Sequence, residues 1–261
     1  MNKNEHGYLV KLEYLGFRYS GWQQQPKHKT IEGMLLKTLQ CIIPERNFKI
    51  LGAGRTDAKV SALDAAFELF IAEKPITNLN NFKDDFNLNL PPDIRIKNIT
   101  RVKDGFNIIQ QAKNKEYVYL FSYGEKNHPF CAPFLANIHE ELNIDLMKDA
   151  AQRFVGTHDF SLYTAKLQPN TKVVRTINSS KIVANTYISA SFFPKKSFAF
   201  VVTGKGFIRY QVRMMMGTLI KIGLGELSMT DFERTLLTDS ELELHYAAPG
   251  SGLLLHKLDF S

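Results

Sequence analysis

The chain has few of the features that mark secreted, membrane or metal-binding proteins. It has two cysteines, Cys41 and Cys131, far apart in the sequence, which predict neither a disulfide framework nor a metal knuckle. Its seven histidines show no close ligand spacing, so no metal is expected. No apolar run approaches the ~18 residues of a membrane span, and no long apolar segment follows the first basic residues. These absences favour a cytoplasmic protein.

Proline is also sparse, with ten residues among 261, and hydrophobic residues make up 44% of the chain. This composition excludes general disorder. A chain of this length can bury a sizeable core, so we expect a globular protein of one or two domains.

Acidic residues are missing from one long block. Between Phe160 and Gly225 the sequence has ten Lys or Arg residues and no Asp or Glu, whereas the whole chain has a net charge of +7. A basic excess confined to one block suits a polyanion held through its phosphates, so nucleic acid is the expected partner. The alternative is that these charges are spread around the surface and form no single binding face.

Hydrophobic periodicity predicts intermingled strands and helices. The predicted strands span residues 8–14, 65–71, 93–102, 117–123, 187–193, 198–204 and 252–260. The predicted helices span residues 31–43, 78–89, 143–154 and 207–223, and a further helix begins at Ser228. Because the order is not the strict alternation of a parallel sheet, we expect an α+β fold with a largely antiparallel central sheet flanked by helices, in two similar α+β halves. We place the domains at 1–108 and 109–261, the second carrying the basic block.

The stretch GAGRTDAKVSALD, residues 52–64, holds the candidate chemistry. It lacks the third glycine of a dinucleotide fingerprint, and no Gly-Lys-Ser/Thr follows for a P-loop. Gly52 and Gly54 would let the backbone bend and a ligand come close, while Arg55 could keep Asp57 ionised or hold a phosphate. This arrangement suits a nucleophile or base. The alternative is that Asp57 only caps a turn and Arg55 is a surface charge.

The sequence GRTDA, after a GWQQQ segment, resembles the tRNA pseudouridine synthase A family, and the resemblance runs nearly end to end. The other matching segments, in order, are LEYLGFRYSGWQQQP, TIEGMLLKTL, LNLPPDIRI, VGTHDFSLY, VVRTI, FIRYQVRMMMGTL and PGSGLLL. The resemblance implies the pseudouridine synthase fold, with an RNA-binding cleft between two halves. It further implies cofactor-free isomerisation of uridine to pseudouridine in the tRNA anticodon stem-loop (positions 38–40), by a homodimer.

The resemblance also implies roles for individual side chains. Asp57 matches the essential aspartate, which would attack the sugar or the base or abstract a ribose proton. Arg213 matches the arginine that pairs with this aspartate, and Arg55 matches the arginine that helps to evict the target base. Tyr117 matches the tyrosine that stacks on the uracil. Without the resemblance, Tyr117 would be read as an ordinary core aromatic on a tyrosine-rich strand.

Further residues are candidates for the uracil pocket and for RNA contact. Leu253 matches a leucine that lines the uracil pocket, although either of the next two leucines could be the inward residue. Arg209, four residues before Arg213 in the predicted helix, should share its face and meet phosphate. Lys205 and Lys59 are additional candidates for RNA contact.

This sequence departs from the family pattern in three places. The family usually has Gly-Val-His after GRTDA, where this chain has Lys59, Val60 and Ser61. Lysine is strained if the backbone needs positive φ; otherwise its ammonium could contact phosphate or favour an ionised carboxylate. Residues 106–109 read Phe-Asn-Ile-Ile instead of Phe-His-Ala-Arg, and Leu15 replaces an aspartate.

These departures concern RNA contacts more than the carboxylate. They therefore put in question which RNA is the substrate more than whether the isomerisation takes place. They leave two alternatives open. One is a protein of the same fold that binds and remodels tRNA without isomerising it, and the other is a synthase with a different RNA target.

Overall fold

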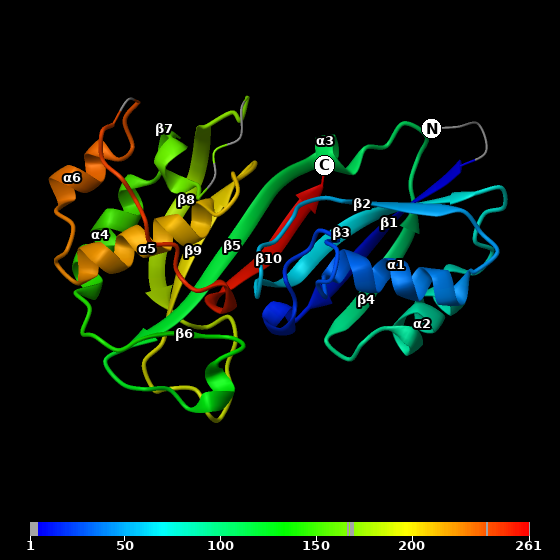
Figure 1. Cartoon of the computed structure of the whole chain (residues 1–261), viewed down its shortest axis with the longest axis horizontal. Helices are drawn as coiled ribbons and strands as arrows, with labels where there is room; N and C mark the ends of the chain where they lie inside the picture. Colours follow the sequence, from blue (N-terminus) through cyan, green and yellow to red (C-terminus); the bar gives the residue numbers. More distant parts are fainter. Residues whose placement is uncertain (1–4, 166, 168–169, 239, 261) are drawn as a thin grey trace. The chain divides into compact units, whose positions relative to one another are not determined.

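The computed structural model describes residues 5–165, 167, 170–238 and 240–260 (Figure 1). It is an α+β fold with a mostly antiparallel sheet flanked by helices, as the sequence predicts. The chain forms two compact units. Unit 1 comprises the described residues up to Lys113 and those from Leu255 on, and unit 2 runs from Asn114 to Leu254. Most of the last strand, from Leu255 on, is thus grouped with the first unit, whereas the sequence-based division left it with the second half.

Unit 1 combines a sheet with two longer helices. Its strands are β1 (Glu5–Tyr14), β2 (Phe48–Gly52), β3 (Ser61–Ala72), β4 (Ile94–Arg101) and β10 (Leu253–Phe260). Its helices are α1 (Ile31–Ile42), α2 (Leu79–Asn89), the short α3 (Ile108–Gln111) and the 3-10 turn η1 (Gly16–Arg18). The strand order is β4-β1-β3-β10, and β2 also pairs with β3. Helix α1 packs against α2, which packs against β4 (Figure 1).

The helix predicted at residues 31–43 is α1. It begins at Thr30, whose side chain accepts the backbone N–H of Gly33 at 3.2 Å and so satisfies one of the unpaired donors of the first turn. Leu35 and Leu39, one turn apart, are completely buried. Trp22, the single tryptophan, is 1% exposed in the same core. The apolar face read from the sequence therefore faces the interior.

Strand β3 contains the strand predicted at residues 65–71, but it is buried on both faces over part of its length. Phe67 belongs to the predicted apolar face, whereas Ala66 and Glu68 on the other face are 2% and 0% exposed. A small apolar cluster covers that second face, and its buried members are Ala53, Ala66, Ile108, Ala112 and Leu258. The backbone N–H of Ile108 donates to Glu68 Oε2 at 3.2 Å, and burial raises the pKa of Glu68.

Unit 2 combines strands with two packed helices. Its strands are β5 (Ala112–Tyr123), β6 (Ala136–Ile138), β7 (Gly156–Asp159), β8 (Val174–Ala184) and β9 (Phe198–Gly204). Its helices and 3-10 turns are α4 (Ile144–Arg153), α5 (Gln211–Gly223), α6 (Met229–Arg234), η2 (Pro129–Cys131), η3 (Ser161–Tyr163) and η4 (Gly250–Gly252). The strand order is β5-β9-β8-β7, with β6 parallel to the end of β5. Helix α4 packs against α5 and β8.

Capping residues mark the helix starts of both units. Asn78, Asn143 and Ser228 each accept backbone N–H groups at the first turns of α2, α4 and α6. The predicted helix starts near residues 78, 143 and 228 are therefore confirmed, because a cap is a local signal that the sequence carries directly.

The strand predicted at residues 187–193 is wrong. The strand that precedes β9 in the chain and pairs with it is β8, at residues 174–184, and residues 187–193 lie in the connection between the two. The side chain of Asn185 accepts the backbone N–H groups of Tyr187 at 3.0 Å and Ile188 at 3.4 Å. This local turn ends the strand before the apolar residues that suggested it. The strand predicted at residues 198–204 is β9 and is confirmed.

Candidate active site

Asp57 lies in the loop that connects β2 to β3, and its side chain is half-buried. The residue before it is fixed by two contacts from the opening segment of the chain. The backbone N–H of Trp22 donates to the carbonyl oxygen of Thr56 at 3.0 Å, and the hydroxyls of Tyr14 and Thr56 are hydrogen-bonded at 2.9 Å. These bonds hold the backbone immediately before the carboxylate.

Two glycines of the opening segment approach the same loop more closely than any side chain would allow. Gly21 has φ +100°, and a Cβ there would lie 2.7 Å from the carbonyl oxygen of Thr56 and 3.1 Å from the carbonyl carbon of Asp57. A Cβ on Gly16 would lie 1.9 Å from the carbonyl oxygen of Val60. The loop is therefore packed backbone to backbone on both sides of Asp57.

Lys59 occupies the position where the family usually has glycine, and its φ is +65°. Of the two possibilities left open by the sequence, the strained one is correct, since only glycine adopts this conformation without cost. The N–H of Lys59 donates to the carbonyl oxygen of Tyr19 at 3.0 Å, and its ammonium lies 5.6 Å from the ring centroid of Phe17. Ser61, which replaces the family's histidine, accepts the N–H of Gly16 at 2.9 Å.

Arg55 is exposed, and its side chain has no hydrogen bond or ion pair within the described part of the chain. It stands two residues before Asp57 on the same loop. An exposed guanidinium without an intramolecular partner is available to an anionic ligand such as phosphate.

Asp93, which the sequence reading did not select, supports this loop indirectly. Its carboxylate accepts the Tyr19 hydroxyl at 2.6 Å and Arg18 Nε at 2.8 Å, and its carbonyl oxygen accepts the N–H of Leu15 at 2.9 Å. Burial alone would raise the pKa of Asp93, but the hydrogen bonds from Tyr19 and Arg18 outweigh it and lower that pKa. Asp93 thereby fixes Tyr19, whose carbonyl holds Lys59. The sequence signal that could have pointed to Asp93 is its place in the LPPDIRI segment, which matches the family.

Asn107 replaces the histidine of a second family pattern and has a structural role. Its side chain accepts the backbone N–H groups of Ile109 and Gln110, so it caps α3. Ile108 is completely buried, whereas Ile109 is 58% exposed.

In unit 2, Tyr117 lies on β5 opposite Val202 of β9 and is 8% exposed. Its ring meets that of Phe207 edge to face, with centroids 5.2 Å apart. Two residues further along β5, Tyr119 is completely buried and donates its hydroxyl to the carbonyl oxygen of Pro249 at 2.8 Å. Burial raises the pKa of Tyr119 well above its ordinary value.

Arg213 lies in the first turn of α5 and is fixed by the segment that precedes η4. Its Nε donates to the carbonyl oxygen of Ala248 at 2.7 Å, and the N–H of Ala248 donates to the carbonyl oxygen of Arg213 at 3.0 Å. One turn later, a Cβ on Gly217 would lie 2.1 Å from the carbonyl oxygen of Tyr246. This backbone contact brings residues 246–248 against α5, and so orients the guanidinium.

Arg209 does not share a helical face with Arg213, because α5 begins at Gln211 and not at residue 207. Tyr210 has φ +67°, which interrupts the helix, and the side-chain oxygen of Gln211 accepts the N–H of Ile208 at 2.9 Å. The two arginines are nevertheless neighbours. Their guanidinium carbons lie 5.1 Å and 5.0 Å from the ring centroid of the same Tyr210.

Leu253 begins β10 directly after η4. A Cβ on Gly252 would lie 2.7 Å from the carbonyl oxygen of Leu120, so η4 packs directly on β5. Leu253, Leu254 and Leu255 are 5%, 3% and 3% exposed. Burial therefore does not decide which of these leucines faces a ligand.

The acid-free block lies within unit 2. Its exposed lysines in the described part of the chain are Lys172, Lys181, Lys195, Lys196 and Lys205. Lys205 directly follows β9, so the predicted RNA contact is at least accessible to solvent.

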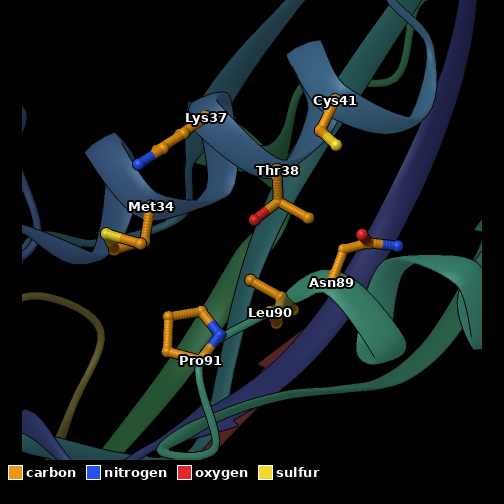
Figure 2. A pocket seen from close by; sticks show the side chains of 7 residues that line it. All are labelled: Met34, Lys37, Thr38, Cys41, Asn89, Leu90 and Pro91. Carbon is orange, nitrogen blue, oxygen red and sulfur yellow. The ribbon is translucent and has the colours of Figure 1, made fainter.

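A groove of about 340 Å³ on unit 1 lies between α1 and the end of α2 (Figure 2). It is lined by Met34, Lys37, Thr38, Cys41, Asn89, Leu90 and Pro91. Figure 2 shows side chains from α1 facing those at the end of α2. None of the residues matched to the family's site lines it. Over the described ranges, no cluster of three or more His, Cys, Asp or Glu could hold a metal, and no helix has the length and apolarity to cross a membrane.

Comparison with known proteins defines the class. Residues 150–261 match the family described as tRNA pseudouridine synthase, and with this fold the protein is an isomerase of the pseudouridine synthase class. A tRNA pseudouridine synthase A from Dictyoglomus thermophilum is 31% identical over 96% of this chain and 98% of its own length. One from Bacillus sp. strain KSM-64 is 33% identical over 98% of this chain and all of its own length. The chain belongs to the tRNA pseudouridine synthase A family.

Proposed function

We propose that this protein isomerises uridine to pseudouridine in the anticodon stem-loop of tRNA, at positions 38–40, with Asp57 as the catalytic carboxylate and without a cofactor. The observation that carries the proposal is the immobilised loop. Backbone contacts from Gly16 and Gly21 flank the carboxylate, and Arg55 beside it keeps no intramolecular partner within the described ranges. Membership of the family supports tRNA as the substrate.

The reaction needs no oxidant or added group. The bond between ribose C1′ and uracil N1 breaks, and a new bond forms between C1′ and C5. N1 gains a proton, and C5 loses its proton to solvent. A fixed carboxylate can attack the sugar, attack the base or abstract a ribose proton, and all three routes end with loss of the hydrogen on C5. Release of that hydrogen therefore reports the complete reaction.

The supporting roles follow from the resemblance and from the local chemistry of each side chain. Tyr117 offers a ring face to an everted uracil, and Leu253 supplies apolar surface for it. Arg213, oriented by Ala248, supplies the cation that pairs with the aspartate. Arg55 fills the space left by the evicted base.

The test is release of tritium from 5-labelled uridine in tRNA. Asp57→Asn should abolish release while tRNA binding persists. Asp104→Asn, which changes an exposed carboxylate elsewhere in unit 1, serves as the control and should release tritium at the wild-type rate. Unchanged release from Asp57→Asn would refute the catalytic assignment. Release from total transcripts but not from tRNA would instead indicate another RNA target.

A second candidate function is tRNA binding or remodelling without turnover, which the left-handed Lys59 favours because it alters the loop two residues after the proposed carboxylate. In that case the wild-type protein would bind tRNA tightly and release no tritium. We also propose a cytoplasmic homodimer. Sedimentation as a monomer at micromolar concentration would remove the dimer from the proposal.

A further inference from the structure

A second group of aromatic residues lies in two loops of unit 2, away from the residues matched to the family's site. One loop connects β5 to β6, and the other connects β8 to β9. Their rings contact one another in a continuous set made of His128, Phe130, Phe134, Phe192 and Phe193. We name the outer three, His128, Phe130 and Phe192, the aromatic platform.

The aromatic platform is compact. The ring centroids of His128 and Phe130 are 5.0 Å apart, those of Phe130 and Phe192 are 5.9 Å apart, and those of His128 and Phe192 are 6.0 Å apart. Phe130 and Phe192 are perpendicular, which is a favourable aromatic geometry. Despite these contacts, the Phe130 side chain is 67% exposed. An apolar ring that lies in water forgoes the stabilisation of burial, and exposed apolar side chains gathered in one place mark interaction sites.

Hydrogen bonds make the aromatic platform rigid. Pro129 begins η2, and the N–H of Phe130 donates to His128 Nδ1 at 3.2 Å. Cys131 is buried, and its Sγ donates to the carbonyl oxygen of Phe192 at 3.3 Å, which ties the two loops together. These bonds fix the backbone beneath Phe130 and Phe192, so the two loops need little ordering when a ligand binds.

The charge around the aromatic platform is mainly positive. Lys126 precedes it in the first loop, and Lys195 and Lys196 follow Phe192 in the second, all three exposed. Glu125 is the nearby acid in the first loop, while the second loop belongs to the acid-free block. Exposed rings beside lysines are the combination that binds unpaired nucleotides, with bases on the rings and phosphates on the cations. A second copy of this chain fits less well, because it would bring like charges together.

We propose that the aromatic platform is an accessory RNA-binding site that stacks an unpaired base of the substrate, with Lys195 and Lys196 holding the neighbouring phosphates. The identity of the RNA rests on the proposed function. The site is distinct from that of the target uridine. Tyr117 and Tyr123, which ends β5 before the first loop, are six residues apart, or roughly 20 Å at the rise of an extended strand.

The first test compares the binding of full-length tRNA and the rate of tritium release for three variants. Phe130→Ala should raise the Kd for tRNA about tenfold, which is about 1.4 kcal/mol, and leave kcat at saturating tRNA unchanged. Phe130→Trp should restore binding, since indole also stacks. Leu88→Ala removes an 83% exposed apolar side chain from α2 and should have no effect. A wild-type Kd for Phe130→Ala would overturn the proposal.

Salt dependence and cross-linking provide independent readouts. A Lys195→Ala, Lys196→Ala double variant should lower the slope of log Kd against log salt by about 1.4. Ultraviolet irradiation of the complex should cross-link RNA to the peptide containing residues 128–130. Absence of that cross-link would overturn the proposal. If Phe130→Ala dissociated a dimer and left RNA binding per monomer unchanged, this face would be assigned to protein contact instead. Both readouts measure RNA binding and remain valid if the protein releases no tritium. Failure of the proposed function can therefore be distinguished from failure of the aromatic-platform proposal.

Discussion

Replacement of Gly21 by alanine should displace the loop that carries Asp57. The new Cβ would lie 2.7 Å from the carbonyl oxygen of Thr56 and 3.2 Å from the amide nitrogen of Ala58, both in the backbone. Neither atom can rotate away, so the two segments must separate by about 0.5 Å to reach ordinary contact distance. The carboxylate moves with the backbone on either side of it.

The expected cost has two parts. Alanine at the φ of Gly21, +100°, costs about 1–2 kcal/mol, and the forced separation costs about 1–3 kcal/mol more. A misplacement of about 1 Å can lower a rate by 10²-fold, so a shift of half that size should lower kcat roughly tenfold. The first quantity is measured by denaturant unfolding and the second by tritium release from saturating tRNA.

Gly105→Ala is the matched control. Gly105 also has positive φ, +82°, but an added Cβ there has no heavy atom within 4 Å. It should therefore show the conformational cost alone, about 1–2 kcal/mol, and a wild-type kcat. Equal unfolding free energies and equal rates for the two variants would refute the claim that the opening segment positions the Asp57 loop.

Two further predictions concern the same region. Lys59→Gly should raise the unfolding free energy by about 0.5–1 kcal/mol because glycine accepts φ +65° freely. Lys59→Ala loses the charge but keeps the strain, so it should not raise the unfolding free energy. A gain in both variants would attribute the effect to charge. Asp93→Asn should lower the unfolding free energy at pH 7 by about 1–3 kcal/mol. Because folding lowers the pKa of Asp93, its contribution is complete above the unfolded pKa, near 3.8, and is lost as the pH falls through the lower folded value. The difference between wild type and Asp93→Asn in acid titrations of stability should therefore shrink below about pH 4, and a constant difference would contradict this account.

Local signals in the sequence were sufficient for much of the fold. Thr30, Asn78 and Ser228 mark helix starts because a capping side chain bonds to the backbone only two or three residues away. Period-two alternation located β9 because the two faces of a strand are set by neighbouring residues. The ordered motifs, from GWQQQ to PGSGLLL, were enough to indicate the family that the comparisons then showed.

The tertiary structure decided what depends on residues distant in sequence. Glu68 reads as a solvent-facing strand residue but is buried, because Ile108 and Leu258 arrive from other elements to cover that face of β3. The conformation of Lys59 follows from its bond to Tyr19, forty residues earlier in the chain, and no local preference for lysine would predict it. The sequence by itself determined the family and made Asp57 the candidate catalytic residue, since both depend on residue identity and order. The position of that carboxylate was decided by backbone contacts from Gly16 and Gly21, which exist only when the opening segment packs against the loop.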